Sequence, residues 1–213
     1  MDFRNLVEIV ASEPVFDTGM LLAGRLDPRH VRRQLSRWTK AGRLYQLRRG
    51  LYSLAPPFQK IKPHPFLIAN RITAGSYVSC QSAMAYYGLI PEYVPITTSV
   101  TTGRPSHRET ELGSYEFRHL KTELFFGYRR LDVGTGQEVF IASPEKALLD
   151  LIYLQPGGDS PDYLKELRLQ SLDILNLNEL QHLTERSGKL KLLRASVLLA
   201  KMLPIDALEY QTL

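Results

Sequence analysis

The feature that most constrains the fold is a change of periodicity at Gly42. Upstream of it, Val31, Leu35 and Trp38 recur at spacings of four and three, which is the apolar stripe of a helix. Downstream, "LYQL" and "LYSL" are short runs of β-forming residues, and the "RRG" between them is typical of a tight hairpin. The stretch 31–54 is therefore predicted to be a helix followed at once by a β-hairpin.

Two shorter helices are predicted before this one. Residues 3–10 place apolar side chains at i, i+3, i+4 and i+7, and a second helix can start at Asp17 or Thr18 and end near Gly24. For the third helix, Asp27 is the candidate N-cap and the proline that follows it suits the first helical position. Three helices and then a hairpin is the element order of a winged helix-turn-helix.

The remainder of the chain mixes strand and helix patterns. Four prolines in "APPFQKIKPHP" indicate a linker at 55–65, and strands are predicted in "VPITTSVTT", "SYEFRHL", "LFFGYRRLDV" and "EVFIA". Helices are predicted in "FLIANRI", in "SCQSAMAYYGL" after a Ser79 cap, and near 161–169, 178–187 and 189–203. The predicted fold class is α+β: an N-terminal winged helix-turn-helix at 1–56, then a larger α+β domain at 57–213 with a helical C-terminal end.

One of these helices, "SPEKALLDLIYL", has clear start signals. Ser143 is the predicted cap and the proline after it takes the first turn. A single apolar face is expected from Ala147, Leu148, Leu151, Ile152 and Leu154.

The positive charge of the chain is concentrated in one segment. Residues 25–49 hold nine Lys or Arg and a single acid, Asp27, whereas residues 55–213 hold seventeen Lys or Arg and seventeen Asp or Glu. A basic helix is usually only a solvated face. Here, however, no acids are spaced for i,i+4 pairing, the cations lie on the third helix, and two arginines lie at the hairpin tip. These features together favour binding to duplex DNA.

Roles follow from position along the segment. The predicted base-edge contacts are three arginines near the start of the third helix, Arg29, Arg32 and Arg33, because arginine can donate two hydrogen bonds to guanine. The predicted phosphate contacts are Ser36, Arg37, Lys40 and Arg43. Thr18 could offer its hydroxyl and nearby N–H groups to a phosphate. Arg48 and Arg49 form the predicted wing tip, where charge reversal should weaken binding to any duplex.

Other classes of function have weaker signals. No apolar run approaches the length of a membrane span and the N-terminus lacks signal-peptide features, so a cytoplasmic location is expected. The scattered histidines and the single cysteine, Cys80, predict no metal site, no cofactor and no catalytic residue. Glu145 beside Lys146 faintly suggests a metal-dependent nuclease, but a capped helix start explains both residues better. The chain is predicted not to be an enzyme.

Five segments together resemble a known family. "RRGLYSL", "YVSCQSAMAYYGLIPE", "TTSVTTGR", "LFFGY" and "IASPEKALLDLIYL" occur in the order and spacing of the AbiEi-type antitoxins, over about residues 1–200. These belong to AbiE-like, type IV toxin–antitoxin systems of bacterial abortive infection. The resemblance implies an N-terminal winged-helix domain and a C-terminal antitoxin domain, and it matches Arg29 to Arg43 and Arg48 to Arg49 to the family's recognition helix and wing.

The same resemblance implies a set of partners. Members bind inverted repeats in their own promoter, repress the operon, and counter a nucleotidyltransferase-like toxin without a stable complex. The expected function is therefore that of a DNA-binding antitoxin and transcriptional autorepressor. The alternatives are a stand-alone winged-helix regulator whose second domain senses a ligand or a protein, and, less favoured, a DNA-acting enzyme.

Overall fold

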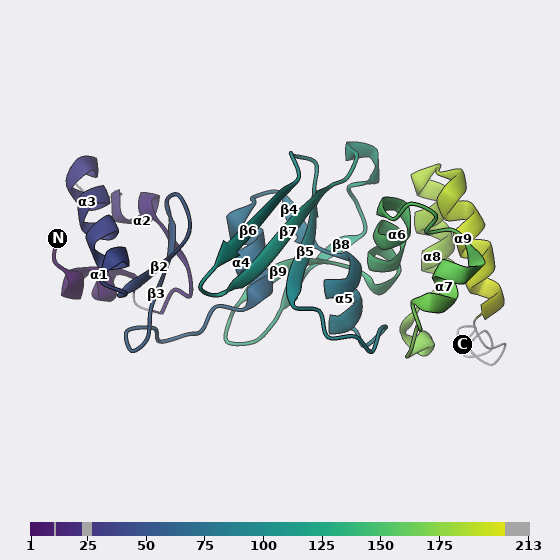
Figure 1. Cartoon of the computed structure of the whole chain (residues 1–213), viewed down its shortest axis with the longest axis horizontal. Coiled ribbons are helices and arrows are strands. Elements are labelled where there is room, and N and C mark those ends of the chain that lie inside the picture. Colours follow the sequence, from purple (N-terminus) through teal and green to yellow (C-terminus); the bar gives the residue numbers. More distant parts are fainter. Residues whose placement is uncertain (11, 23–26, 203–213) are drawn as a thin grey trace.

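Three helices and a small sheet occupy one end of the molecule (Figure 1). The computed structural model describes residues 1–10, 12–22 and 27–202. The elements of this end are α1 (Phe3–Val10), β1 (Phe16–Asp17), α2 (Thr18–Leu22), α3 (Pro28–Lys40), β2 (Leu44–Arg48) and β3 (Leu51–Leu54). The three strands pair antiparallel in the order β1-β3-β2. The predicted third helix and hairpin are thus confirmed as elements.

The boundaries of α3 follow from local chemistry. The Asp27 carboxylate accepts a hydrogen bond from the N–H of Arg29 at 3.0 Å, and Pro28 occupies the first helical position. At the other end Gly42 has a φ of +68°, which a glycine adopts at little cost. The predicted start and stop of this helix are confirmed, whereas the end predicted for the second helix near Gly24 lies outside the described residues.

A mixed six-stranded sheet forms the centre of the molecule. Its strands are β4 (Ser76–Val78), β5 (Ile96–Thr101), β6 (Ser106–Thr110), β7 (Gly113–His119), β8 (Tyr128–Asp132) and β9 (Glu138–Ala142). They are arranged in the order β6-β7-β5-β4-β9-β8, in which β5 pairs β7 parallel and β4 pairs β9 parallel. Four of these strands were predicted. The short β4 and the edge strand β6, exposed along most of its length, were missed because neither has a two-residue alternation of buried and exposed side chains.

Helices flank the sheet and form the far end of the molecule (Figure 1). They are α4 (Pro65–Ile72), α5 (Cys80–Tyr86), α6 (Pro144–Leu154), α7 (Pro161–Glu166), α8 (Leu177–Ser187) and α9 (Leu190–Met202), with short 3-10 turns at Thr122–Leu124 and Leu172–Ile174. Helix α4 packs on β4 and β9, while α6 packs against α5, α8 and α9. The described chain is therefore a mixed α+β fold with a helical C-terminal end.

Two hydrophobic clusters make the core, and the hairpin belongs to both. Leu44, Tyr52 and Leu54 of the hairpin pack in the N-terminal cluster with the apolar side of α3. Leu47 and Leu51 of the same hairpin pack in the large cluster built around the six-stranded sheet. The N-terminal unit is therefore joined to the rest of the molecule by apolar contacts as well as by the chain segment between β3 and α4.

Helix α6 differs from its sequence prediction. Instead of one apolar face, every residue from Pro144 to Ile152 is buried, including three charged ones. The Lys146 ammonium is paired with the Asp150 carboxylate, whose other oxygen accepts hydrogen bonds from the Tyr77 hydroxyl at 2.9 Å and the Ser79 hydroxyl at 2.7 Å. Ser79 was the predicted cap of α5, but its hydroxyl makes no capping bond and is used for this contact.

We predict that removing Lys146 makes the protein's stability strongly pH-dependent. Burial already raises the pKa of the Asp150 carboxyl from 3.8, and the lysine opposes that rise. In Lys146→Met the native carboxyl should stay protonated while the unfolded one ionises, so unfolding releases a proton above pH 3.8. The free energy of unfolding of Lys146→Met should therefore fall by about 1.4 kcal/mol per pH unit while the native carboxyl stays protonated.

Urea unfolding at pH 5, 6, 7 and 8 measures this slope, which should extend to higher pH than in the unmodified protein because Lys146 opposes the rise of the Asp150 pKa. The double variant Lys146→Met/Asp150→Asn is the control, because an amide cannot ionise yet still accepts hydrogen bonds from Tyr77 and Ser79. Parallel pH profiles for Lys146→Met and the unmodified protein would contradict the prediction.

Candidate nucleic-acid interface

Helix α3 separates an apolar side from a basic side. Val31, Leu35 and Trp38 are buried against the N-terminal cluster, and the Trp38 ring meets Phe3 edge-on with centroids 5.3 Å apart. Apart from Pro28 at the first position, the exposed residues of α3 are Arg29, Arg32, Arg33, Ser36, Arg37 and Lys40. They recur at i, i+3, i+4, i+7, i+8 and i+11, so they lie within an arc of about 140° around the helix axis. The structure thus brings all the predicted α3 contact residues onto one side of one helix.

The cations of this face have no acidic partners among the described residues. Every ion pair within 4 Å in that part of the chain involves other side chains. Like charges at i and i+4, such as Arg29 and Arg33, destabilise an isolated helix by a few tenths of a kcal/mol per pair. The basic face therefore slightly destabilises α3, and the buried stripe on the opposite side compensates for it.

Arg43 and Thr18 lie beside this face in different ways. The Arg43 guanidinium lies over the Phe3 ring, 5.0 Å from its centroid, and the residue is exposed. The Thr18 hydroxyl and the Thr18 N–H both point at the carbonyl oxygen of Gly50, at 3.3 and 2.8 Å. The Thr18 hydroxyl that was predicted to contact a phosphate therefore already has a partner within the protein.

The two arginines at the hairpin tip are not equivalent. Arg49 is exposed, with its side chain in none of the ion pairs of the described residues. Arg48 is half-buried, and its guanidinium lies 3.3 Å from the Asp17 carboxylate while its Nε donates to the Arg71 carbonyl at 3.2 Å. Arg71, on α4, contacts the other oxygen of Asp17 at 2.9 Å. Sequence reasoning treated Asp17 only as a possible helix cap and missed this bridge, for which the sequence holds no local signal.

The arginines of the six-stranded sheet do not form a single basic surface that continues the α3 face. Arg118 donates to the Leu154 carbonyl at 3.2 Å, and Arg130 is paired with Glu138 at 3.1 Å. These two lie on β7 and β8, near opposite edges of the six-stranded sheet. Arg118 and Arg130 therefore do not belong to one cluster of cations.

Alternative chemistries find little support in the described part of the chain. Glu145 is buried and accepts a hydrogen bond from the Asn176 N–H at 2.9 Å, so neither it nor Lys146 is open to a substrate. Burial raises the pKa of the Cys80 thiol to about 12, which disfavours a thiolate. Across residues 1–10, 12–22 and 27–202 there is no group of three or more potential metal ligands, and no helix there has the length and apolar character of a membrane span.

Comparison with known proteins adds no assignment. No protein-family model matches this sequence, and no curated protein is significantly similar to it. What the chain binds must therefore be argued from the geometry above.

We predict that Arg49 contributes to duplex binding and that Arg48 contributes to the stability of the fold. Arg49→Ala should weaken duplex binding and lower its salt dependence by about one contact, because a free cation is lost. Arg48→Ala should instead lower the free energy of unfolding by about 1 kcal/mol, because its contacts are internal and partly exposed to solvent. Thermal unfolding and fluorescence-anisotropy titrations of both variants, at three salt concentrations, separate the two effects. An equal loss of affinity in both variants would argue against this division.

Proposed function

We propose that the chain is a DNA-binding transcriptional repressor whose N-terminal unit acts as a winged helix-turn-helix. The observation that carries the proposal is the α3 face: five cations and a serine on one side of a helix, without acidic partners in the described chain. Such a face suits a polyanion, and a helix ~20 Å long fits the major groove of B-form DNA. The β2–β3 hairpin follows α3 directly, in the position of a wing.

Contacts can be divided by their position on α3. Arg29, Arg32 and Arg33 lie in the first turns and are proposed to reach base edges, where arginine can bind guanine O6 and N7 together. Ser36, Arg37, Lys40 and the nearby Arg43 are proposed to hold phosphates and thereby set the register. Arg49 is proposed as the wing contact. An operator with two half-sites would need two copies of the chain.

The biological role that we propose is that of an AbiE-like antitoxin and autorepressor. Support for this step comes only from the resemblance of the five sequence segments described above. The resemblance suggests that the operator is an inverted repeat in the chain's own promoter. It also suggests a nucleotidyltransferase-like toxin as the functional partner, which the chain would counter without forming a stable complex. The α3 face itself supports DNA binding alone.

We predict that two groups of α3 variants will behave differently in a titration against the upstream intergenic duplex and a scrambled duplex. Arg33→Ala should weaken binding to the upstream duplex by roughly 5- to 150-fold and reduce the preference for it. Lys40→Ala should weaken binding to both duplexes alike and reduce the salt slope by about one. Lys165→Ala, an exposed cation on α7, is the matched control and should change neither quantity.

Three possible results of this titration bear on different parts of the proposal. Equal affinity of the unmodified protein for the two duplexes would remove sequence-specific repression. Unchanged affinity in both α3 variants would remove α3 as the interface. An upstream duplex bound specifically, with no toxin gene adjacent, would favour the stand-alone regulator over the antitoxin.

A further inference from the structure

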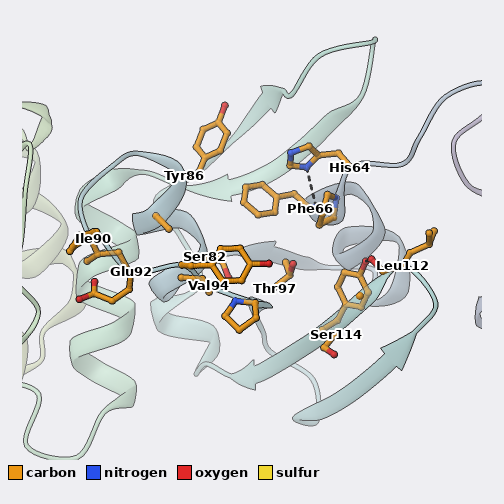
Figure 2. Close-up of a pocket in the computed structure, with 17 residues that line it drawn as sticks. His64, Phe66, Ser82, Tyr86, Ile90, Glu92, Val94, Thr97, Leu112 and Ser114 are labelled. Atoms are coloured by element: carbon orange, nitrogen blue, oxygen red, sulfur yellow. Dashed lines mark hydrogen bonds between the residues drawn. The ribbon is translucent and has the colours of Figure 1, made fainter.

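A cavity lies beside the sheet, away from the α3 face. Its volume is about 660 Å³, within the range of about 300 to 1,000 Å³ that small-molecule sites occupy. The start of α4, the exposed side of α5, the loop Ile90–Pro95 and strands β5 and β7 line it (Figure 2). Neither the basic segment nor the proposed repressor function accounts for this cavity.

The electrostatics of the cavity exclude most anions. None of its lining residues is a lysine or an arginine, and Glu92 is the only carboxylate. Burial lowers the pKa of His64, and its Nδ1 accepts a hydrogen bond from the Phe66 N–H at 3.2 Å, so both features favour the neutral imidazole. A phosphate or sulfonate would therefore enter without any countercharge, which is costly in a partly buried site.

One polar group in the cavity wall is left without a partner. Thr97 lines the cavity and is 9% exposed, and its hydroxyl makes no hydrogen bond to any described residue. Its neighbours in the wall are satisfied: the Ser82 hydroxyl donates to the Ile96 carbonyl at 3.0 Å, and the Tyr115 hydroxyl donates to the Leu112 carbonyl at 3.2 Å. Because the Thr97 hydroxyl faces the cavity and has no partner among the described residues, it is available for a hydrogen bond to a ligand.

Aromatic side chains line other parts of the same cavity. Phe66 and Tyr86 lie with ring centroids 5.6 Å apart at a tilt of 59°, and both face the cavity (Figure 2). Tyr93, on the facing loop, is 88% exposed. Rings that are this open can pack against a further ring in offset or edge-to-face geometry.

We propose that this cavity is a binding site for an uncharged, ring-containing small molecule that forms a hydrogen bond with the Thr97 hydroxyl. The volume, the aromatic lining and the Thr97 hydroxyl without a protein partner support a ring compound that forms a hydrogen bond, and the lack of cationic side chains argues against an anion. The proposal does not depend on DNA binding, so either can fail without the other.

A matched pair of fluorescent probes tests the proposal on the full chain. N-phenyl-1-naphthylamine is uncharged and carries an N–H, and 8-anilinonaphthalene-1-sulfonate has the same rings with an added sulfonate. We expect the uncharged probe to bind saturably with one site per chain, and the sulfonate to bind roughly tenfold more weakly or worse. Absence of saturable binding, or equal binding of the two probes, would overturn the proposal.

Variants locate the bound probe. Thr97→Val keeps the β-branched shape but removes the hydroxyl, and it should weaken binding of the uncharged probe about three- to tenfold. Thr97→Ser should restore most of that affinity, and Tyr86→Ala should weaken binding through loss of the ring. The control is Leu190→Ser/Leu193→Ser on α9, which removes another exposed apolar surface. Binding that is lost in the α9 control and kept in the cavity variants would contradict the site.

Discussion

The two-sided packing of the β2–β3 hairpin determines how the rest of the structure is assembled. Alternate side chains of this short element face different cores, with Leu44 and Leu54 toward α3 and Leu47 and Leu51 toward the central sheet. The period of two in a strand makes this possible, because successive residues point to opposite faces. Apolar contacts on both faces therefore hold this hairpin between α3 and the central sheet.

Because α3 is held by its buried side, its exposed face need not contribute to the folding of the helix. Burial of Val31, Leu35 and Trp38 supplies the stabilising contacts, at about 1.5 to 3 kcal/mol for each fully buried large side chain. Repulsion between neighbouring arginines costs only a few tenths of a kcal/mol per pair. The stabilisation from the buried side is therefore much larger than the repulsion on the basic side. The residues of the exposed side can thus be selected for binding rather than for folding.

Local signals made the first part of the fold predictable, and non-local contacts made the rest unpredictable. Asp27, Pro28 and Gly42 act within a few residues of themselves, so the limits of α3 could be read directly. The exposed face of α3 followed from helix phase alone. By contrast, the partners of Arg48 lie 31 and 23 residues away, at Asp17 and Arg71, and no spacing rule connects them. The buried ion pair of α6 was unpredictable as well, because burial of a whole helix depends on what packs around it. The cavity was unpredictable because its walls come from four separate segments of the chain.

Helix α4 shows how the two candidate sites are related within this fold. Its first residues, Pro65 and Phe66, line the cavity, whereas Arg71 in its last turn contacts Asp17 of the N-terminal unit. The cavity and the basic face differ in chemistry: one has no cationic side chain, and the other has five cations and no acidic partner in the described chain. A phosphate backbone and an uncharged ring compound would therefore not compete for the same surface. Because the cavity residues and Arg71 lie at the two ends of this eight-residue helix, the N-terminal unit and the cavity are attached to opposite ends of one element.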